Sequence, residues 1–142
     1  VSGASDLCLV VGGDTNSRVL NPSDIKTYPL FGDGAGAVLL SRGSPEQGIV
    51  AYSMGADGSG GDLLSRPAGG SRMKLSPEVL AAGLHYMHMD GRAVFRWAVA
   101  ILCDTIQDVL NAAGLATEDV DLYIPHQANI RIINASIDVL HI

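Results

Sequence analysis

The stretch that decides the fold is Leu122-Tyr123-Ile124-Pro125-His126-Gln127-Ala128-Asn129. Its apolar residues 122–124 predict a short strand, and four apolar residues at helical spacing predict an amphipathic helix that begins near Asn129: Ile130, Ile133, Ile137 and Leu140. His126 therefore falls between a strand end and a helix N-terminus. At such a position the backbone holds an imidazole rigidly while a substrate approaches from outside, so His126 is a candidate for chemistry.

Three apolar runs upstream of this stretch predict further strands. Residues 7–11 are apolar and are closed by Gly12-Gly13-Asp14, a pattern typical of a strand buried on both faces. Residues 35–40 predict a second buried strand that follows a glycine-rich segment, and residues 48–54 predict a third strand. Residues 16–28 and the glycine-rich segment 55–70 are expected to be loops.

Two helices are expected before the strand at 122–124. Ser76 and Pro77 match the N-cap and first position of a short helix. Apolar residues recur at three-and-four spacing from Val94 to Val109, and Gly114 suits the left-handed cap of this longer helix. The order strand, strand, strand, helix, helix, strand, helix predicts a mixed α/β layered fold.

Composition excludes several classes of protein. The chain has 142 residues, 47% of them apolar, and none of its apolar runs approaches the roughly 20 residues that cross a bilayer. Nine Lys and Arg against fifteen Asp and Glu, with no basic block, argue against nucleic-acid binding. Cys8 and Cys103 lie in apolar surroundings without metal-like spacing, which predicts buried, reduced thiols and a cytoplasmic protein. Because Val1-Ser2-Gly3-Ala4 is neither a natural start nor a signal peptide, a piece of a longer protein is expected.

Two other features have weaker claims to chemistry. The run Gly32-x-Gly34-x-Gly36 precedes a strand, whereas a dinucleotide loop opens a helix, so close backbone packing explains these glycines better. His85 and His88 lack the cysteine or carboxylate partners of a metal site, and we expect no bound metal.

His126 could be a structural histidine of the kind common beside apolar strands. Its neighbours favour a catalytic role, because Gln127 and Asn129 supply amide donors, Arg131 adds a cation and the helix start offers main-chain N–H groups. Such a group suits a developing oxyanion or an anionic substrate.

The motifs resemble those of the β-ketoacyl-acyl-carrier-protein synthase III family, condensing enzymes of the thiolase superfamily. Phe31-Gly32-Asp33-Gly34-Ala35-Gly36-Ala37 is followed about ninety residues later by Pro125-His126-Gln127-Ala128-Asn129-x-Arg131-Ile132. Met89-x-Gly91-Arg92-x-Val94-Phe95 and the glycine loop Asp57-Gly58-Ser59 are also similar to family motifs and stand in the family order.

The resemblance implies a thiolase-like layered αβαβα fold, here partial, with mixed sheets and buried helices. Residues 1–45 would end the N-terminal half-domain, and residues 46–142 would form most of the C-terminal half-domain. Family members pair as homodimers across a sheet edge near the strand at residues 7–11. This chain taken without its remainder would expose apolar sheet and helix surface.

The resemblance further implies a decarboxylative Claisen condensation of acyl-CoA with malonyl-acyl-carrier protein, without cofactor or metal. His126 would donate a hydrogen bond from Nε2 to the malonyl thioester oxygen and so stabilise the enolate. Arg131 would attract the acidic carrier protein or a phosphate. A narrow tunnel for the pantetheine arm would be lined by Phe31, Met89, Gly91, Phe95, Ala128 and Asn129.

Three departures from the family pattern leave alternatives open. The family's nucleophilic cysteine lies upstream of residue 1, and its catalytic asparagine lies in a loop downstream of the helix that ends here. Ile25-Lys26-Thr27 stands where the family often has an arginine. The alternatives are a related thiolase-superfamily acyltransferase of secondary metabolism, or a catalytically incomplete fragment with a structural or binding role.

Overall fold

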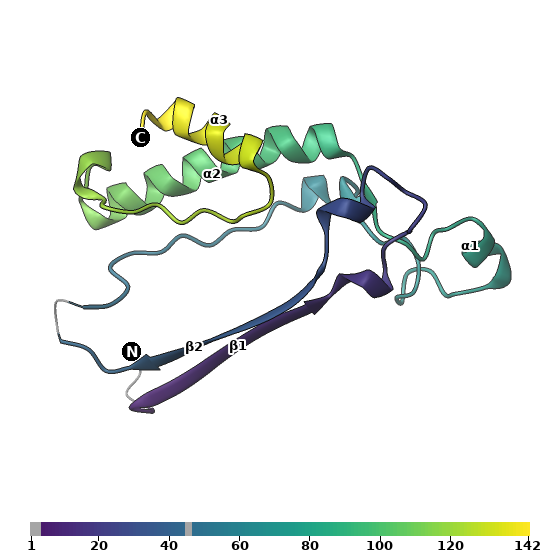
Figure 1. Cartoon of the computed structure of the whole chain (residues 1–142), viewed down its shortest axis with the longest axis horizontal. Helices are drawn as coiled ribbons and strands as arrows, with labels where there is room; N and C mark the ends of the chain where they lie inside the picture. The colour runs from purple at the N-terminus through teal and green to yellow at the C-terminus, as the bar shows by residue number, and fades with distance from the viewer. Residues whose placement is uncertain (1–3, 45–46) are drawn as a thin grey trace. The chain divides into compact units, whose positions relative to one another are not determined.

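The structure, a computed structural model, describes residues 4–44 and 47–142 (Figure 1). The chain divides into two compact units, the first made of residues 1–48 and 66–87 and the second of residues 49–65 and 88–142. Each unit therefore joins segments that are distant in sequence. The helices and strands are β1 (Leu7–Thr15), β2 (Asp33–Ser41), β3 (Leu64–Ser65), α1 (Pro77–Ala81), β4 (His88–Met89), α2 (Gly91–Ala113) and α3 (Ile130–Leu140).

The first unit contains a long antiparallel hairpin made by β1 and β2, which lie side by side in Figure 1. Its register runs from Leu7 opposite Ser41 to Thr15 opposite Asp33, so both predicted strands are present and longer than expected. The glycines at 12, 13, 34 and 36 lie within the strands rather than beside them. At Gly13 an added Cβ would come within 3.3 Å of the Ala35 methyl, so glycine permits a close approach there.

The prediction that these strands are buried on both faces is wrong. Every residue of β1 and β2 is exposed, and Leu9, Val11 and Leu39 are each more than 60% exposed. Within the described part of the first unit, neither face of the two-stranded sheet carries a packed layer. Cys8 is accordingly an exposed thiol rather than a buried one, and Cys103 is half-buried; neither forms a disulfide. The expected exposure of apolar sheet surface is confirmed.

A small core holds the rest of the first unit together. Leu20, Thr27 and Ala68 are almost fully buried. A main-chain hydrogen bond from Met87 to Val19 (2.7 Å) links the two segments of the unit, and one from Ala68 to Leu84 (2.9 Å) closes the second segment on itself. The predicted start of α1 is confirmed, because the Ser76 hydroxyl accepts from the Val79 N–H at 3.3 Å.

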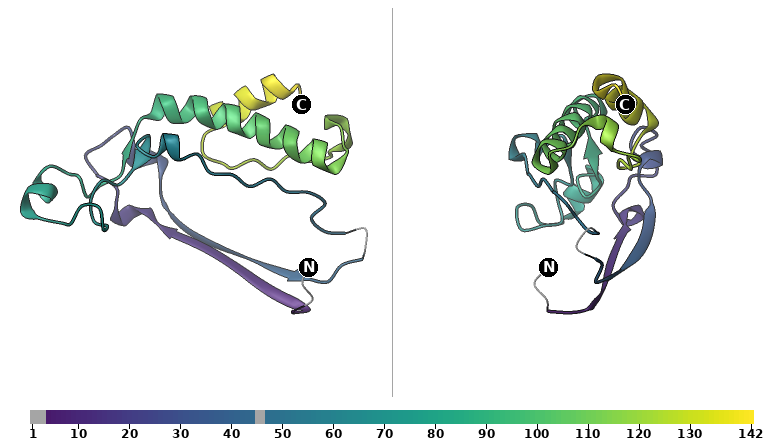
Figure 2. Two further views of the ribbon diagram at one scale, coloured as in Figure 1. Left: turned by 180° about the vertical axis from the view of Figure 1, so that it is seen from behind. Right: turned by 90° about the vertical axis from the view of Figure 1, so that its left-hand side faces the viewer.

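The second unit is built on two helices, which lie side by side in both views (Figure 1, Figure 2). The Asp90 carboxylate caps α2 by accepting from the Arg92 and Ala93 N–H groups, and Gly114 ends it at a φ of 69°. Asn129 caps α3 through the Arg131 N–H at 2.9 Å. Both helices were predicted, and none in the described part of the chain is long and apolar enough to cross a membrane.

Two predicted strands are absent from the structure. Residues 48–54 and 122–124 form no ladder, and Ile49, Val50 and Ile124 are each about four-fifths exposed. A strand exists only where a neighbouring strand accepts and donates its main-chain hydrogen bonds, and no described segment pairs with either stretch. Conversely, β3 and β4 pair antiparallel over two residues each, which is too short to leave a periodic pattern in the sequence.

Candidate functional site

His126 lies in the loop that leads into α3, where its side chain is exposed. The loop is fixed on both sides of it: the Gln127 side chain donates to the Pro125 carbonyl at 3.0 Å, and Asn129 caps the helix. The imidazole itself has no hydrogen bond to any residue in the described ranges. An exposed ring on a fixed loop is available to a substrate.

The two polar ends of the Asn129 side-chain amide differ in this loop. Its side-chain oxygen accepts from the Arg131 N–H, and its main-chain carbonyl accepts from Ile132 at 3.0 Å. The amide oxygen is thus committed to the helix cap, whereas the NH₂ group remains able to donate. Arg131 is exposed in the first turn of α3 and forms no ion pair with the described residues, so its charge faces outward.

A second group of predicted residues surrounds the start of α2. Met89 lies in β4 opposite Leu64, Gly91 opens the helix, and Phe95 is half-buried one turn later. An added Cβ at residue 91 would contact the Met89 methyl at 3.6 Å. The main-chain Asp90 N–H donates to the Leu63 carbonyl at 2.8 Å, which fixes this segment against the glycine-rich loop.

The eight predicted site residues therefore fall into separate groups. Four of them flank the start of α3: His126, Ala128, Asn129 and Arg131. Three flank the start of α2: Met89, Gly91 and Phe95. Both groups belong to the second unit, whereas Phe31 belongs to the first. No hydrogen bond described within the second unit joins the two groups, so each is positioned by its own helix start.

Sequence reasoning missed the side-chain contacts of Asp57. Its Oδ1 accepts from the Ser59 hydroxyl at 2.6 Å and from the Ser59 N–H at 2.9 Å. These bonds lower the pKa of Asp57, the Ser59 hydroxyl most strongly, and the Trp97 side chain acts in the same direction. Asp57 and Trp97 both belong to the second unit, but they are too far apart in sequence for a local pattern to relate them.

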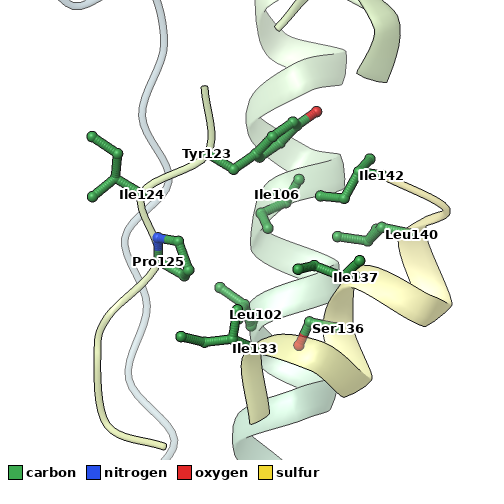
Figure 3. Close-up of a pocket in the computed structure, with 10 residues that line it drawn as sticks. All are labelled: Leu102, Ile106, Tyr123, Ile124, Pro125, Ile133, Ser136, Ile137, Leu140 and Ile142. Carbon is green, nitrogen blue, oxygen red and sulfur yellow. The ribbon is translucent and has the colours of Figure 1, made fainter. Parts of the chain in front are cut away.

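A cavity of about 210 Å³ lies in the second unit, and His126 is not among the residues that line it. Figure 3 shows side chains of α2 and α3 facing one another across it, with the segment 123–125 along one side. The Ser136 hydroxyl donates to the Ile132 carbonyl, so it directs no free donor into the cavity. Because its lining is mostly apolar, the cavity is a gap in side-chain packing. It is lined by Leu102, Ile106, Tyr123, Ile124, Pro125, Ile133, Ser136, Ile137, Leu140 and Ile142.

Among the described residues, His85 and His88 are not joined by further metal-binding side chains. No cluster of three or more His, Cys, Asp or Glu side chains that could hold a metal occurs in the described part of the chain. The His85 ring packs on Tyr86 with centroids 3.9 Å apart, and its buried Nδ1 has no hydrogen-bond partner in that part. His85 is a packing residue by this geometry.

Two family profiles match the sequence. The profile described as 3-oxoacyl-[acyl-carrier-protein (ACP)] synthase III matches residues 1–58, and the one described as its C terminal matches residues 110–142. The chain is 46% identical over 136 residues to β-ketoacyl-[acyl-carrier-protein] synthase III of Symbiobacterium thermophilum, covering 96% of this chain and 41% of that protein. It is 52% identical over 126 residues to 3-oxopimeloyl-[acyl-carrier-protein] synthase of Rhodothermus marinus, covering 88% and 37%.

The fold agrees with these sequence relationships. The crystal structure of 3-oxoacyl-(acyl carrier protein) synthase III from Pseudomonas aeruginosa superimposes with a TM-score of 0.82 at 41% identity, covering 99% of this chain and 41% of that one. The chain thus spans about two-fifths of the length of the relatives it matches, and the predicted thiolase-like fold is confirmed. On sequence and structure together, the chain belongs to the 3-oxoacyl-[acyl-carrier-protein] synthase III family.

Proposed function

We propose that the protein containing this chain is an acyltransferase that condenses acyl-CoA with malonyl-acyl-carrier protein and so initiates fatty-acid synthesis. The observation that carries the proposal is the 46% identity to a β-ketoacyl-[acyl-carrier-protein] synthase III over 96% of this chain. Residues 1–45 are assigned to the end of the N-terminal half-domain and residues 46–142 to the C-terminal half-domain. The protein would act as a cytoplasmic homodimer.

In this reaction a cysteine thiolate first takes the acyl group and releases CoA. The malonyl thioester then loses CO₂ by cleavage of its carboxyl C–C bond, and the electron pair passes to the thioester enolate. The enolate carbon attacks the acyl-cysteine, a C–C bond forms and the thiolate leaves. Neither Cys8, in the middle of a β-hairpin, nor Cys103, half-buried in α2, suits the nucleophile. We assign the nucleophile and the catalytic asparagine to parts of the protein outside this chain.

His126 would stabilise the enolate in the decarboxylation step. Its exposed ring makes no hydrogen bond within the described residues, so Nε2 is available to donate to the thioester oxygen as negative charge develops there. The amide NH₂ of Asn129, whose oxygen is held in the helix cap, adds a second donor at the same helix start. The arrangement favours the enolate over the ground-state thioester, which is the requirement for catalysis.

The pantetheine arm would pass the half-buried aromatic and thioether side chains that flank the start of α2. The proposed lining within the second unit is Met89, Gly91, Phe95, Ala128 and Asn129, and the family resemblance alone adds Phe31 of the first unit. Gly91 adds no side chain to this wall, and a Cβ there would contact the Met89 methyl at 3.6 Å. A narrow wall with few polar groups suits a flexible, weakly polar arm.

The proposal is tested by supplying the purified full-length protein with acetyl-CoA and malonyl-acyl-carrier protein. We expect one CO₂ and one free CoA for each 3-oxoacyl-acyl-carrier protein formed. Product formation without CO₂ release, or release without product, would contradict the assigned condensation.

A second candidate function differs only in the primer. The similarity to a 3-oxopimeloyl-[acyl-carrier-protein] synthase favours a dicarboxylic acyl group, because removing the two malonyl-derived carbons from a seven-carbon product leaves a five-carbon diacid thioester. A higher kcat/KM with glutaryl-CoA than with acetyl-CoA would select this candidate. Preference for acetyl-CoA would select the first.

Replacing Arg131 by glutamate should raise the KM for malonyl-acyl-carrier protein about tenfold while changing the KM for acyl-CoA less than twofold. The Arg131 guanidinium is exposed and forms no ion pair with the described residues, so it would meet an acidic partner surface, and the substitution reverses its charge. Steady-state kinetics with each substrate varied in turn measures the difference.

The matched control is Arg72→Glu. Arg72 is also exposed but lies in the first unit, whereas Arg131 lies in the second. It should leave both KM values unchanged. Equal effects of the two substitutions on the carrier-protein KM would remove Arg131 from the docking surface.

A further inference from the structure

The extended segment 121–124 leads directly to His126 and is attached to the second unit through Tyr123. Its residues form no ladder with the described parts of the chain, and both neighbours of Tyr123 are exposed. Tyr123 itself is half-buried, and its hydroxyl donates to the Thr117 carbonyl at 3.1 Å. Among the described residues, no other hydrogen bond reaches residues 121–124. Within them, the segment depends on one side chain for its attachment.

The Tyr123 ring also faces side chains of two helices. It lines the cavity of the second unit together with Leu102 and Ile106 of α2 and Ile137 of α3. Figure 3 shows the ring directed from the segment toward α2. A tyrosine suits this position, because its ring packs on aliphatic side chains while its hydroxyl reaches a carbonyl. Packing and a hydrogen bond therefore hold the same side chain.

The acceptor of this hydrogen bond, the Thr117 carbonyl, lies in a turn that is joined to the buried end of α2. The Asp119 carboxylate closes this turn by accepting from the Ala116 N–H at 2.8 Å. The preceding residue, Leu115, donates its N–H to the carbonyl of Leu110 at 3.0 Å, and Leu110 is only 5% exposed. A shift of the turn would strain these hydrogen bonds, so the hydroxyl ties the segment to a fixed point.

The short connection from Tyr123 to His126 has little freedom. Only two residues separate them, and the second is Pro125, whose ring fixes its φ at about −65°. The Pro125 carbonyl accepts from the Gln127 side chain at 3.0 Å, and beyond it the Asn129 side chain caps α3. A displacement of the backbone at Tyr123 would therefore be passed on to the backbone at His126.

We infer that Tyr123 is a positioning residue for His126, because its ring and its hydrogen bond to Thr117 fix the segment that presents the imidazole to the malonyl thioester. For the role of His126 the inference rests on the proposed function, whereas the attachment of the segment rests on the contacts alone. Tyr123 acts through the backbone of residues 124–126. The hydroxyl, and not only the ring, should therefore matter for decarboxylation.

The test compares Tyr123→Phe with Tyr52→Phe in the full-length protein. Both remove a phenol hydroxyl from the second unit, but Tyr52 is exposed and makes no hydrogen bond with the described residues. We expect Tyr123→Phe to lower kcat for CO₂ release from malonyl-acyl-carrier protein about tenfold with KM within about twofold, because a small misplacement of a catalytic group slows the chemical step. Acyl transfer from acyl-CoA should stay within about twofold of wild type. Tyr52→Phe should change neither half-reaction.

A double variant decides whether the hydroxyl acts through the imidazole. In the His126→Ala background, Tyr123→Phe should cause no further loss of CO₂ release, because residues that act through one contact are non-additive. A further tenfold loss in the double variant, or an equal loss in both half-reactions of the single variant, would overturn the inference. Either result would indicate a general disturbance of the fold.

Amide hydrogen exchange tests the attachment without any turnover. Exchange at residues 121–124 should quicken about tenfold in Tyr123→Phe and should be unchanged in Tyr52→Phe, because the first variant loosens the segment and the second does not. Exchange no faster in Tyr123→Phe than in Tyr52→Phe would show that the hydroxyl does not hold the segment, and would overturn the inference.

Failure of the two proposals can be told apart. A wild-type protein that turns over no thioester would overturn the proposed function, and the exchange comparison would still decide whether Tyr123 holds the segment. Normal turnover in the wild type, with CO₂ release by Tyr123→Phe equal to that of Tyr52→Phe, would overturn the inference and leave the proposed function intact.

Discussion

Replacing His126 by alanine should lower the rate of 3-oxoacyl product formation by a factor of about 10²–10³, the usual loss when one donor to a developing oxyanion is removed. The ring is exposed, lies on a loop fixed by Gln127 and Asn129, and makes no hydrogen bond to the described residues. Its loss should therefore remove a contact to substrate without disturbing its surroundings.

The loss should be confined to one half-reaction. Transfer of a radiolabelled acyl group from acyl-CoA to the protein should continue at nearly the wild-type rate, because that step needs no enolate. Release of CO₂ from malonyl-acyl-carrier protein should fall with the overall rate. An equal loss in both half-reactions would show that His126 does not act on the malonyl thioester.

A matched control uses a histidine at the opposite end of the same helix. His141 is exposed and follows α3 at a φ of 56°, a conformation that asparagine tolerates. His141→Asn should leave both half-reactions within about twofold of wild type. A similar loss in this variant would indicate a general effect of removing an imidazole near α3.

The helices were predictable because their signals are local. Ser76 and Asn129 each cap the helix that the sequence assigned to them, and Gly114 adopts the left-handed conformation expected of it. The position of His126 in the loop before α3 was predictable for the same reason, because it depends only on where α3 begins. Resemblance then identified the family from the order of the motifs.

The strands and the pairing of residues 63–65 with residues 88–90 were less predictable because they depend on distant segments. Residues 48–54 and 122–124 have the composition of strands but no partner in the described structure, and the burial expected of β1 needs a covering layer. Leu63 and Asp90 are joined by a main-chain hydrogen bond but lie far apart in sequence, so no local pattern relates them. In each case the missing information is the identity of a neighbour in space.

Replacing Leu110 by alanine should lower the free energy of unfolding by about 2–5 kcal/mol, the range for removing a buried leucine side chain. Leu110 is only 5% exposed and is the one residue of α2 that is fully within the core. Its main-chain carbonyl accepts from the Leu115 N–H at 3.0 Å, so it also lies where the helix turns into the next segment. Urea unfolding of the full-length protein, followed by circular dichroism, measures the loss.

Asp108→Ala is the control for this substitution, because it lies on the same helix with an exposed side chain and no hydrogen bond to the described residues. Exposed helical positions usually tolerate alanine within about 0.5 kcal/mol. If Leu110→Ala lowers the free energy of unfolding no more than this control, the end of α2 is not part of the core of the second unit. The position of the loop that carries His126 would then depend on the Gln127 contact with Pro125 and on the cap at Asn129. A loss of activity in Asn129→Ala greater than in Leu110→Ala would follow.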